Sequence, residues 1–217
     1  MNRVPPHLLS SLSVAWMIAA PLAAGAQARD EGILELRLAG AEAGQERFSA
    51  VPTPNGFRLT SELTLTTVRP ALQFAISVDR SSPGDFAFQF RRSAGPSAQY
   101  FAILSKNRLT IRRIEVGTEY ATESRGTQDM VPLADSMVAP LLQLVPPPGE
   151  TERSYTAVYP EGNRRGRVLA TRSTEVDGTV RITFSGGLEG VLILAPDGTI
   201  RRASLPGLRL EAERQLP

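Results

Sequence analysis

The stretch Phe57-Arg58-Leu59-Thr60-Ser61-Glu62-Leu63-Thr64-Leu65-Thr66 alternates apolar or small side chains with polar ones at each step. A period of two residues is typical of a β-strand with one face on a core and the other in water. The preceding Pro52-Thr53-Pro54-Asn55-Gly56 predicts a turn, because Asn-Gly tolerates the positive φ angles of a tight hairpin. Residues 57–66 are therefore predicted to be the returning strand of a hairpin.

The same alternation continues along most of the chain, with Gly, Pro, Asn and Asp clusters between the strands. Tight turns are predicted at Lys106-Asn107, Asp177-Gly178 and Asp197-Gly198. The repeat predicts a mainly β protein, built as a large curved antiparallel sheet (a half-barrel or open barrel) of about ten strands with one short helix. A shift from Leu109 and Ile111 to Ile114 and Val116 predicts a bulge near Arg112-Arg113. A return strand is predicted to start at Phe48 and its neighbours, and the other predicted strands cover residues 34–38, 57–66, 72–78, 86–90, 100–104, 108–116, 155–159, 167–175, 179–185, 191–194, 199–204 and 208–213.

One segment breaks the alternation and predicts the helix, at about residues 133–145. Asp135 is suited to its N-cap, and Pro140 predicts that it is short, broken or late in starting. The triple proline at 146–148 followed by Gly149 ends it. Apolar residues at helical spacing are Met137, Val138, Leu141, Leu142 and Leu144.

The first 28 residues have the layout of a cleavable secretory signal. Arg3 is followed by an apolar stretch, a helix-breaking Pro21 and the A-x-A site at residues 26–28. We therefore predict residues 1–28 as a signal peptide and 29–217 as a single antiparallel β domain, periplasmic or secreted. No later segment is long and apolar enough to span a bilayer as a helix.

Composition argues against several classes of function. The chain has 24 basic and 22 acidic residues, so no strong positive field indicates nucleic acid. It has no cysteine, and its single histidine, His7, lies in the predicted signal. Residues 29–217 therefore lack the groups for Ser-His-Asp or Cys-His catalysis and for the usual zinc or haem ligation. We expect no catalytic residue, no metal and no cofactor.

Composition leaves open carboxylate chemistry or a lysine base, although Lys106, the only lysine, is also explained as a turn residue. Two facing carboxylates suffice for glycoside cleavage. Hairpin or loop side chains that could pair in this way are Glu115, Glu119, Glu123, Asp129 and Asp135. A carboxylate-dependent hydrolase is thus a third hypothesis, although solvated strand faces and a helix cap also account for these residues.

A sheet of this length presents more apolar surface than one short helix can cover. The uncovered part must meet another part of the sheet, a partner or a ligand. The first hypothesis is an envelope protein that binds a lipid, acyl chain or protein segment on its concave apolar face. Its predicted lining residues, which plain core packing also explains, are Leu59, Leu63, Phe74, Ile76, Phe86, Phe88, Met137 and Leu141.

Arginine pairs suggest a second contact for such a ligand. Guanidinium groups form forked hydrogen bonds with phosphates and carboxylates. If they share one rim, an anionic headgroup would meet Arg112, Arg113, Arg164 and Arg165. The alternative explanation is that these arginines only keep the tips of the hairpins soluble.

Three short motifs give the layout a resemblance. They are Gly44-Gln45-Glu46 in an early hairpin, Pro132-Leu133-Ala134-Asp135-Ser136 near the middle, and Pro196-Asp197-Gly198-Thr199-Ile200-Arg201-Arg202 in a closing strand. The chain resembles uncharacterised bacterial periplasmic families of unknown function. In shape these are similar to curved-sheet periplasmic carriers of lipoproteins, from which this chain differs in having one clear helix.

The resemblance implies a non-catalytic role in the cell envelope and assigns no site residue. A structural or interaction module of envelope maintenance, with a filled core and no small ligand, is the second hypothesis. A lipid or an envelope protein is the expected partner in either case.

Overall fold

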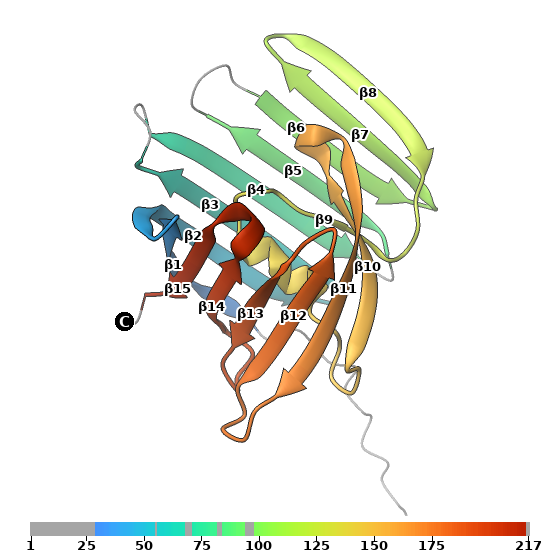
Figure 1. The fold of residues 1–217 in the computed structure, drawn as a ribbon. Helices are drawn as coiled ribbons and strands as arrows, with labels where there is room; N and C mark the ends of the chain where they lie inside the picture. Colours follow the sequence, from blue (N-terminus) through green and yellow to red (C-terminus); the bar gives the residue numbers. More distant parts are fainter. Residues whose placement is uncertain (1–28, 55, 68–70, 82–83, 94–97, 216–217) are drawn as a thin grey trace, which may run out of the picture.

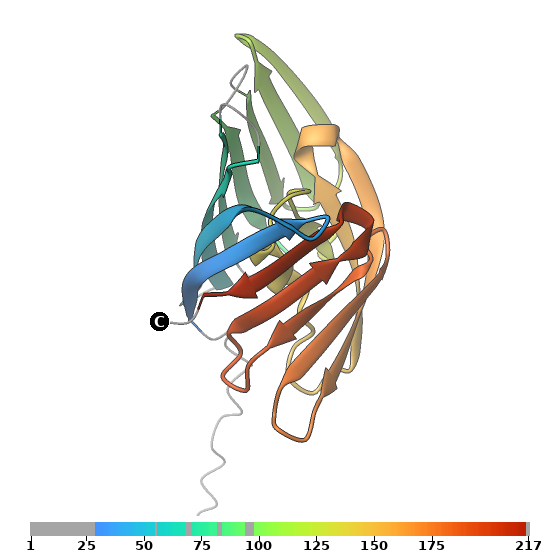
Figure 2. The same cartoon turned by 60° about the vertical axis from the view of Figure 1, so that its left-hand side comes forward.

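In the computed structural model, residues 29–54, 56–67, 71–81, 84–93 and 98–215 are described. The predicted signal peptide, Asn55, Ser82 and Pro83 lie outside these residues. The described strands form one 15-stranded sheet in the order β8-β7-β6-β5-β4-β3-β2-β1-β15-β14-β13-β12-β11-β10-β9. Figure 1 shows this sheet rolled around a short central segment, and Figure 2 shows its two halves facing each other.

The first half of the sheet is a meander. Its strands are β1 (Asp30–Leu38), β2 (Ala41–Thr53), β3 (Gly56–Leu65), β4 (Leu72–Ser81), β5 (Phe86–Arg92), β6 (Ala98–Ser105), β7 (Arg108–Glu115) and β8 (Thr118–Arg125).

The second half contains the remaining strands and the 3₁₀ turns. These are β9 (Met130–Pro132), η1 (Ala139–Leu144), β10 (Glu152–Tyr159), η2 (Pro160–Gly162), β11 (Arg164–Thr174), β12 (Val180–Gly186), β13 (Gly190–Leu194), β14 (Ile200–Leu205), η3 (Pro206–Leu208) and β15 (Leu210–Arg214).

Alternation along β3 sets which side chains face inward. Phe57, Leu59, Ser61, Leu63 and Leu65 are buried, while the residues between them are exposed or half-buried. The partners of Leu59, Ala50 on β2 and Val78 on β4, are buried as well. The predicted hairpin before β3 is confirmed, with Thr53 opposite Gly56. The sequence period therefore predicted the inner face of this part of the sheet correctly.

The first and last described strands meet in the middle of the sheet, where β1 pairs with β15. The side chain of Asp30 is 1% exposed, and one of its carboxylate oxygens accepts a hydrogen bond from Arg214 Nη1 at 2.7 Å. The other accepts one from the backbone N–H of Ile200 at 2.8 Å. This buried ion pair ties the first described strand to the last two.

The roll is open, because β8 and β9 are the edges of the sheet and do not pair with each other. β9 pairs with β10 in parallel, the one exception to the predicted antiparallel arrangement. A side-chain hydrogen bond from Arg165 on β11 to Ser124 on β8 crosses the gap. The fold is thus an open, barrel-like sheet, as the alternation predicted.

Several details of the prediction are wrong. The sheet has 15 strands rather than about ten, partly because short pieces such as β9 carry too few residues to show a period. No bulge occurs near Arg112-Arg113, since β7 keeps its register with both neighbours. Ile114 simply points away from the face that carries Leu109 and Ile111.

The predicted helix at 133–145 is also shorter than expected. Only Ala139–Leu144 is helical, as a 3₁₀ turn with Pro140 in its first turn, and all six of its residues are buried. Asp135 does not cap it, because η1 starts later and has Val138 at its N-cap; the Asp135 carboxylate pairs with Arg164. The proline at 140 fits a start at that point, where its missing N–H costs nothing.

Candidate binding pocket

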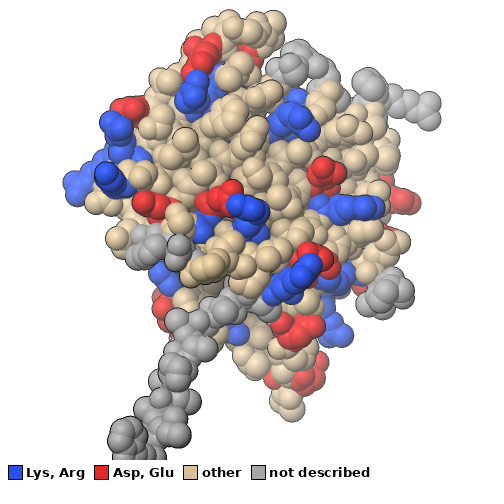
Figure 3. Space-filling model, turned by 180° about the vertical axis from the view of Figure 1, so that it is seen from behind, with Lys and Arg blue, Asp and Glu red and all other residues tan. Residues whose placement is uncertain are grey.

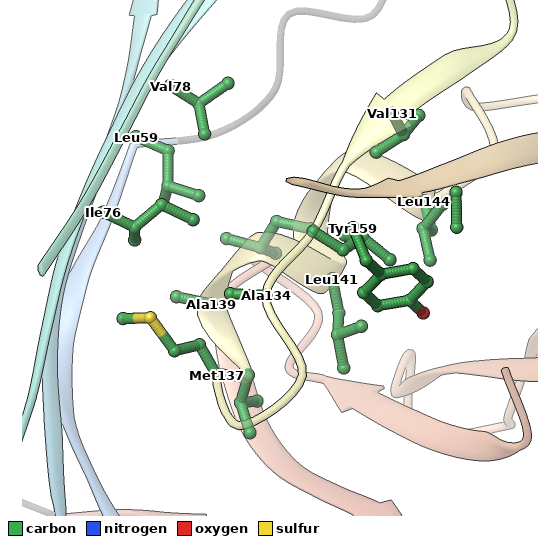
Figure 4. Close-up of a cluster of buried hydrophobic side chains, with 14 of the residues drawn as sticks. Leu59, Ile76, Val78, Val131, Ala134, Met137, Ala139, Leu141, Leu144 and Tyr159 are labelled. Carbon is green, nitrogen blue, oxygen red and sulfur yellow. The ribbon is translucent and has the colours of Figure 1, made fainter. Parts of the chain in front are cut away.

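The concave face of the sheet is filled by the chain itself. Residues 133–145, which follow β9 and which we call the plug, run through the inside of the roll between its two halves. Figure 4 shows Leu59 and Ile76 on the sheet facing Met137 and Ala139 of the plug. Every predicted lining residue is buried except Phe74, which is half-buried and packs on the same core. These residues therefore meet one another and the plug, and the expectation of an uncovered apolar face is not met.

A buried carboxylate holds the plug in place. Glu46 on β2 is fully buried, and its carboxylate oxygens accept hydrogen bonds from the N–H groups of Val138 (2.7 Å) and Ala139 (3.0 Å). Ser61 Oγ donates a third at 2.7 Å. Burial raises the pKa of Glu46, and these three hydrogen bonds oppose the rise. The arrangement satisfies the N–H groups that the start of η1 leaves without helical partners.

The hydrogen bonds between Glu46 and the start of η1 explain the Gly44-Gln45-Glu46 motif in structural terms. Gly44 has a φ of +152° and lies at the register shift between β1 and β2. A Cβ at this position would stand 1.9 Å from the carbonyl oxygen of Thr64. The glycine permits the irregular pairing, and Glu46 faces inward two residues later.

A pocket of about 360 Å³ opens at one end of the roll, beside the C-terminal end of η1. We call it the end pocket. Its walls come from the start of β3, the proline run after η1 and the hairpin between β13 and β14. It is lined by Phe57, Leu142, Gln143, Val145, Pro146, Pro147, Pro148, Arg172, Val180, Leu194, Pro196, Asp197 and Gly198.

Turn chemistry fixes one wall of the end pocket. Asp197 accepts hydrogen bonds from the backbone N–H (3.0 Å) and the hydroxyl (2.7 Å) of Thr199, and Gly198 has a φ of +86°. The backbone hydrogen bond from Thr199 to Asp197 holds the pKa of this carboxyl below its usual value. The predicted Asp-Gly turn is confirmed, and it presents Pro196 to the pocket.

The polar lining of the end pocket is sparse. Arg172 is half-buried, and its Nη1 donates to the carbonyl oxygen of Pro146 at 3.0 Å. Gln143 is 5% exposed, and its Nε2 donates to the carbonyl oxygen of Pro132 at 2.9 Å. The Oε1 atom of Gln143 is buried and has no hydrogen-bond partner among the described residues. An unsatisfied buried acceptor is costly to the folded state.

Sequence reasoning missed Glu46 and Gln143 as important residues. The sequence nevertheless marks both residues as polar side chains at inward-facing positions. Glu46 stands two residues before the apolar Phe48 in the inward phase of its strand, and Gln143 interrupts the apolar run from Leu141 to Val145. A polar residue at an inward position needs a partner inside the fold, and it therefore marks a contact worth locating.

The predicted headgroup arginines do not form one cluster. Neighbouring residues of a strand point to opposite faces, so Arg112 and Arg113 diverge on β7, as do Arg164 and Arg165 on β11. Each is engaged within the chain: Arg112 with Glu119 (2.7 Å), Arg113 with Glu115 (3.5 Å), Arg164 with Asp135 (2.5 Å) and Arg165 with Ser124. Figure 3 shows acidic and basic side chains interspersed over one face of the molecule.

The candidate carboxylates likewise have partners of their own. Glu115 accepts a hydrogen bond from the Tyr100 hydroxyl at 2.6 Å on the inner face of the sheet, whereas Glu119 lies on the outer face with Arg112. Asp129 accepts one from Thr156 at 2.6 Å. Among the described residues, no three His, Cys, Asp or Glu side chains gather as a metal site.

A larger hollow of about 730 Å³ follows the outer surface of β1 to β4. Much of its lining is exposed and polar, including Arg47, Thr60 and Glu62. No buried atom without a partner lies among its lining side chains. We therefore regard the smaller end pocket as the better candidate site.

These features define the chain as an open, barrel-like β protein with an internal plug and an end pocket. No protein-family profile matches it, and no curated protein matches it. It is similar in fold to the crystal structure of a β-barrel-like protein of the domain of unknown function DUF1849 from Brucella abortus. That likeness has a TM-score of 0.57 at 10% identity and covers 89% of this chain and 98% of the other. No helix in the described part of the chain is long and apolar enough to cross a membrane.

Proposed function

We propose that the protein is an exported, non-catalytic binding protein of the bacterial cell envelope that holds a small apolar ligand in the end pocket. The observation that carries the proposal is a mostly apolar pocket at the end of the roll, walled by the proline run after η1 and by the turn at Pro196 to Gly198. Its volume of about 360 Å³ falls in the range of small-molecule sites, roughly 300–1,000 Å³. The proposed ligand site lies at the end of the roll, and in this proposal the filled concave face serves as core.

The layout of residues 1–28 supports export, and the lack of His and Cys in residues 29–217 supports a non-catalytic role. A small ligand also suits the size of the site better than a protein segment does. Stable protein interfaces bury about 800 Å² on each partner, which a pocket of this size does not supply.

Displacement of a fluorescent fatty acid by 1-dodecanol tests the proposal. We expect saturable binding of the probe to the wild-type chain and competition by the alcohol. Val145→Trp places a larger ring in the pocket wall and should weaken probe binding by about tenfold or more, equivalent to roughly 1.4 kcal/mol. Ile103→Trp, on an exposed site of β6, is the matched control and should bind as wild type does. Absence of saturable binding, or equal loss in both variants, would refute the proposal.

A second candidate is an interaction module without a small ligand. It is favoured by the filled interior and by β8, an edge strand whose residues are exposed except for the half-buried Ser124. Such an edge offers unpaired backbone groups to a partner strand. A photo-crosslinker at Tyr120 on β8 should then capture one discrete partner in the intact envelope, whereas the same group at Thr183 on β12 should not. Identical crosslinking at the two positions argues against this candidate.

A further inference from the structure

The two edges of the described sheet differ in how well they are protected. β9 is three residues long, is buried and ends in Pro132, which has no N–H for a neighbouring strand. β8 is eight residues long, contains no proline and keeps one unbroken register with β7, so no bulge turns it aside. Figure 1 shows β8 at the outer margin of the sheet, and among the described strands only β7 pairs with it. The backbone groups along its other side are therefore open to a partner strand.

The charged side chains of β8 lie together on its outer face, because they occupy alternate positions of the strand. Glu119, Glu123 and Arg125 are all exposed. Glu119 pairs with Arg112 on β7 at 2.6 Å, and Glu123 lies 3.7 Å from Arg108. Arg125 forms no ion pair with a described residue, and it stands opposite Arg108, a like charge. The open edge thus carries one cation whose charge the chain itself does not neutralise.

A second copy of this chain can pair with the edge in only a few ways, because symmetry limits the register. When two identical strands pair antiparallel, the two-fold axis is perpendicular to the sheet and places one residue opposite its own copy. Every other residue then meets a residue from the same face of the partner strand. Two such registers use most of β8, one centred on Ala121 and the other on Thr122.

Charge decides between these two registers. The register centred on Ala121 sets Glu119 opposite the partner's Glu123 at two symmetric contacts, and like charges directly opposite each other destabilise a pair of strands. The register centred on Thr122 sets Glu119 opposite the partner's Arg125, again at two symmetric contacts. It therefore supplies Arg125 with the acidic neighbour that it lacks within its own chain.

We propose that two copies of the protein associate about a two-fold axis by antiparallel pairing of their β8 strands, with Thr122 opposite the partner's Thr122. The pairing joins the two sheets edge to edge and satisfies the backbone groups of both open edges. No residue of β8 lines the end pocket, so the inference goes beyond the ligand site. It identifies the partner of the β8 edge as a second copy of this chain.

Single cysteines test the dimer and its register together, because the natural chain has no cysteine. Residues directly opposite each other have Cα atoms about 4.5–5.5 Å apart, within reach of a disulfide. Thr122→Cys should therefore give a disulfide-linked dimer under mild oxidation with copper phenanthroline. Ala121→Cys is the matched control, since this position is also exposed but would lie beyond the roughly 7 Å limit from its own copy, and it should stay largely unlinked.

A pair of charge-reversal variants tests the contact between Glu119 and Arg125. In sedimentation velocity, Glu119→Arg and Arg125→Glu should each weaken self-association by about tenfold or more, because both contacts become repulsive. An equal mixture of the two variants restores opposite charges at both contacts and should associate about as tightly as wild type. Arg91→Glu, at an exposed position of β5, makes the same charge change away from the edge and should not rescue Glu119→Arg when mixed with it.

The outcomes that overturn the proposal are distinct from those that concern the end pocket. Wild-type protein that stays monomeric at every concentration, equal linking of Thr122→Cys and Ala121→Cys, or a mixture of charge variants that does not associate would each refute the dimer. Capture of a different protein by the crosslinker at Tyr120, in place of a second copy, would also do so. None of these results alters the expected binding of the fluorescent fatty acid.

Discussion

Glu46 on β2 and Val138 before η1 are 92 residues apart in sequence, and a 2.7 Å hydrogen bond joins the carboxylate of one to the N–H of the other. Through this contact the first half of the sheet holds the segment that fills its own interior. The same segment ends in Leu142 and Gln143 at the end pocket, so a buried acid positions the wall of the candidate site.

Glu46→Gln should lower the free energy of unfolding by about 1–3 kcal/mol near pH 5, because the amide nitrogen cannot accept a hydrogen bond, whereas both oxygens of the Glu46 carboxyl can, with or without its proton. The substitution therefore strands a buried N–H. Urea denaturation measures the change. Glu62→Gln, on the exposed side of β3, is the matched control and should stay within about 0.5 kcal/mol of wild type. Equal effects of the two substitutions would show that Glu46 does not anchor the plug.

The raised pKa of Glu46 makes this difference depend on pH. Between the ordinary carboxyl pKa and the raised one, the folded protein holds a proton that the unfolded chain has lost, so stability falls as pH rises through that window. The stability advantage of wild type over Glu46→Gln should therefore be largest at or below about pH 4.5 and shrink toward neutral pH. Denaturation curves at several pH values check this, and an advantage that grows with pH contradicts it.

Asp30→Ala should cost about 3–5 kcal/mol, because it leaves Arg214 and the Ile200 N–H without their buried partner. The exposed pair Arg58–Asp79, whose side chains are 63% and 54% accessible, provides the comparison. Asp79→Ala should cost less than about 1 kcal/mol. Thermal or urea unfolding of both variants measures the difference, and a similar small cost for both would mean that the chain ends are not tied by Asp30.

Leu59→Ala should lower the free energy of unfolding by about 2–5 kcal/mol, because its side chain is fully buried against the core. Since Leu59 does not line the end pocket, the affinity for the fluorescent fatty acid should stay within about twofold at a temperature where the variant is folded. If folded Leu59→Ala lost its affinity for the fluorescent fatty acid, the ligand would bind on the concave face and not in the end pocket.

Cleavage after Ala28 would make Arg29 the first residue of the exported protein, with Asp30 directly after it at the start of β1. Intact-mass measurement of protein recovered from the periplasm or medium should therefore match residues 29–217. Ala26→Asp should block processing because the site requires a small residue there, and Ala24→Asp is the nearby control. Unprocessed protein confined to the cytoplasm would contradict the predicted export.

The sequence by itself determined the β class, the inner face of strands such as β3, and the turns at Lys106-Asn107, Asp177-Gly178 and Asp197-Gly198. It could do so because these depend on local terms: alternation along the strand and residues that tolerate positive φ. It did not determine what covers the concave face, since that depends on where residues 130–145 travel after leaving β8.

Only the tertiary structure revealed the buried hydrogen bonds of Glu46 and Gln143 and the burial of all predicted lining residues but Phe74. Both polar residues take their meaning from partners distant in sequence, Val138 for Glu46 and Pro132 with the pocket wall for Gln143. Hydrogen bonding across such distances is fixed by the path of the chain, and a strand period carries no information about that path. For the same reason the arginine pairs were visible in the sequence, while their separation onto opposite faces and their individual partners were not.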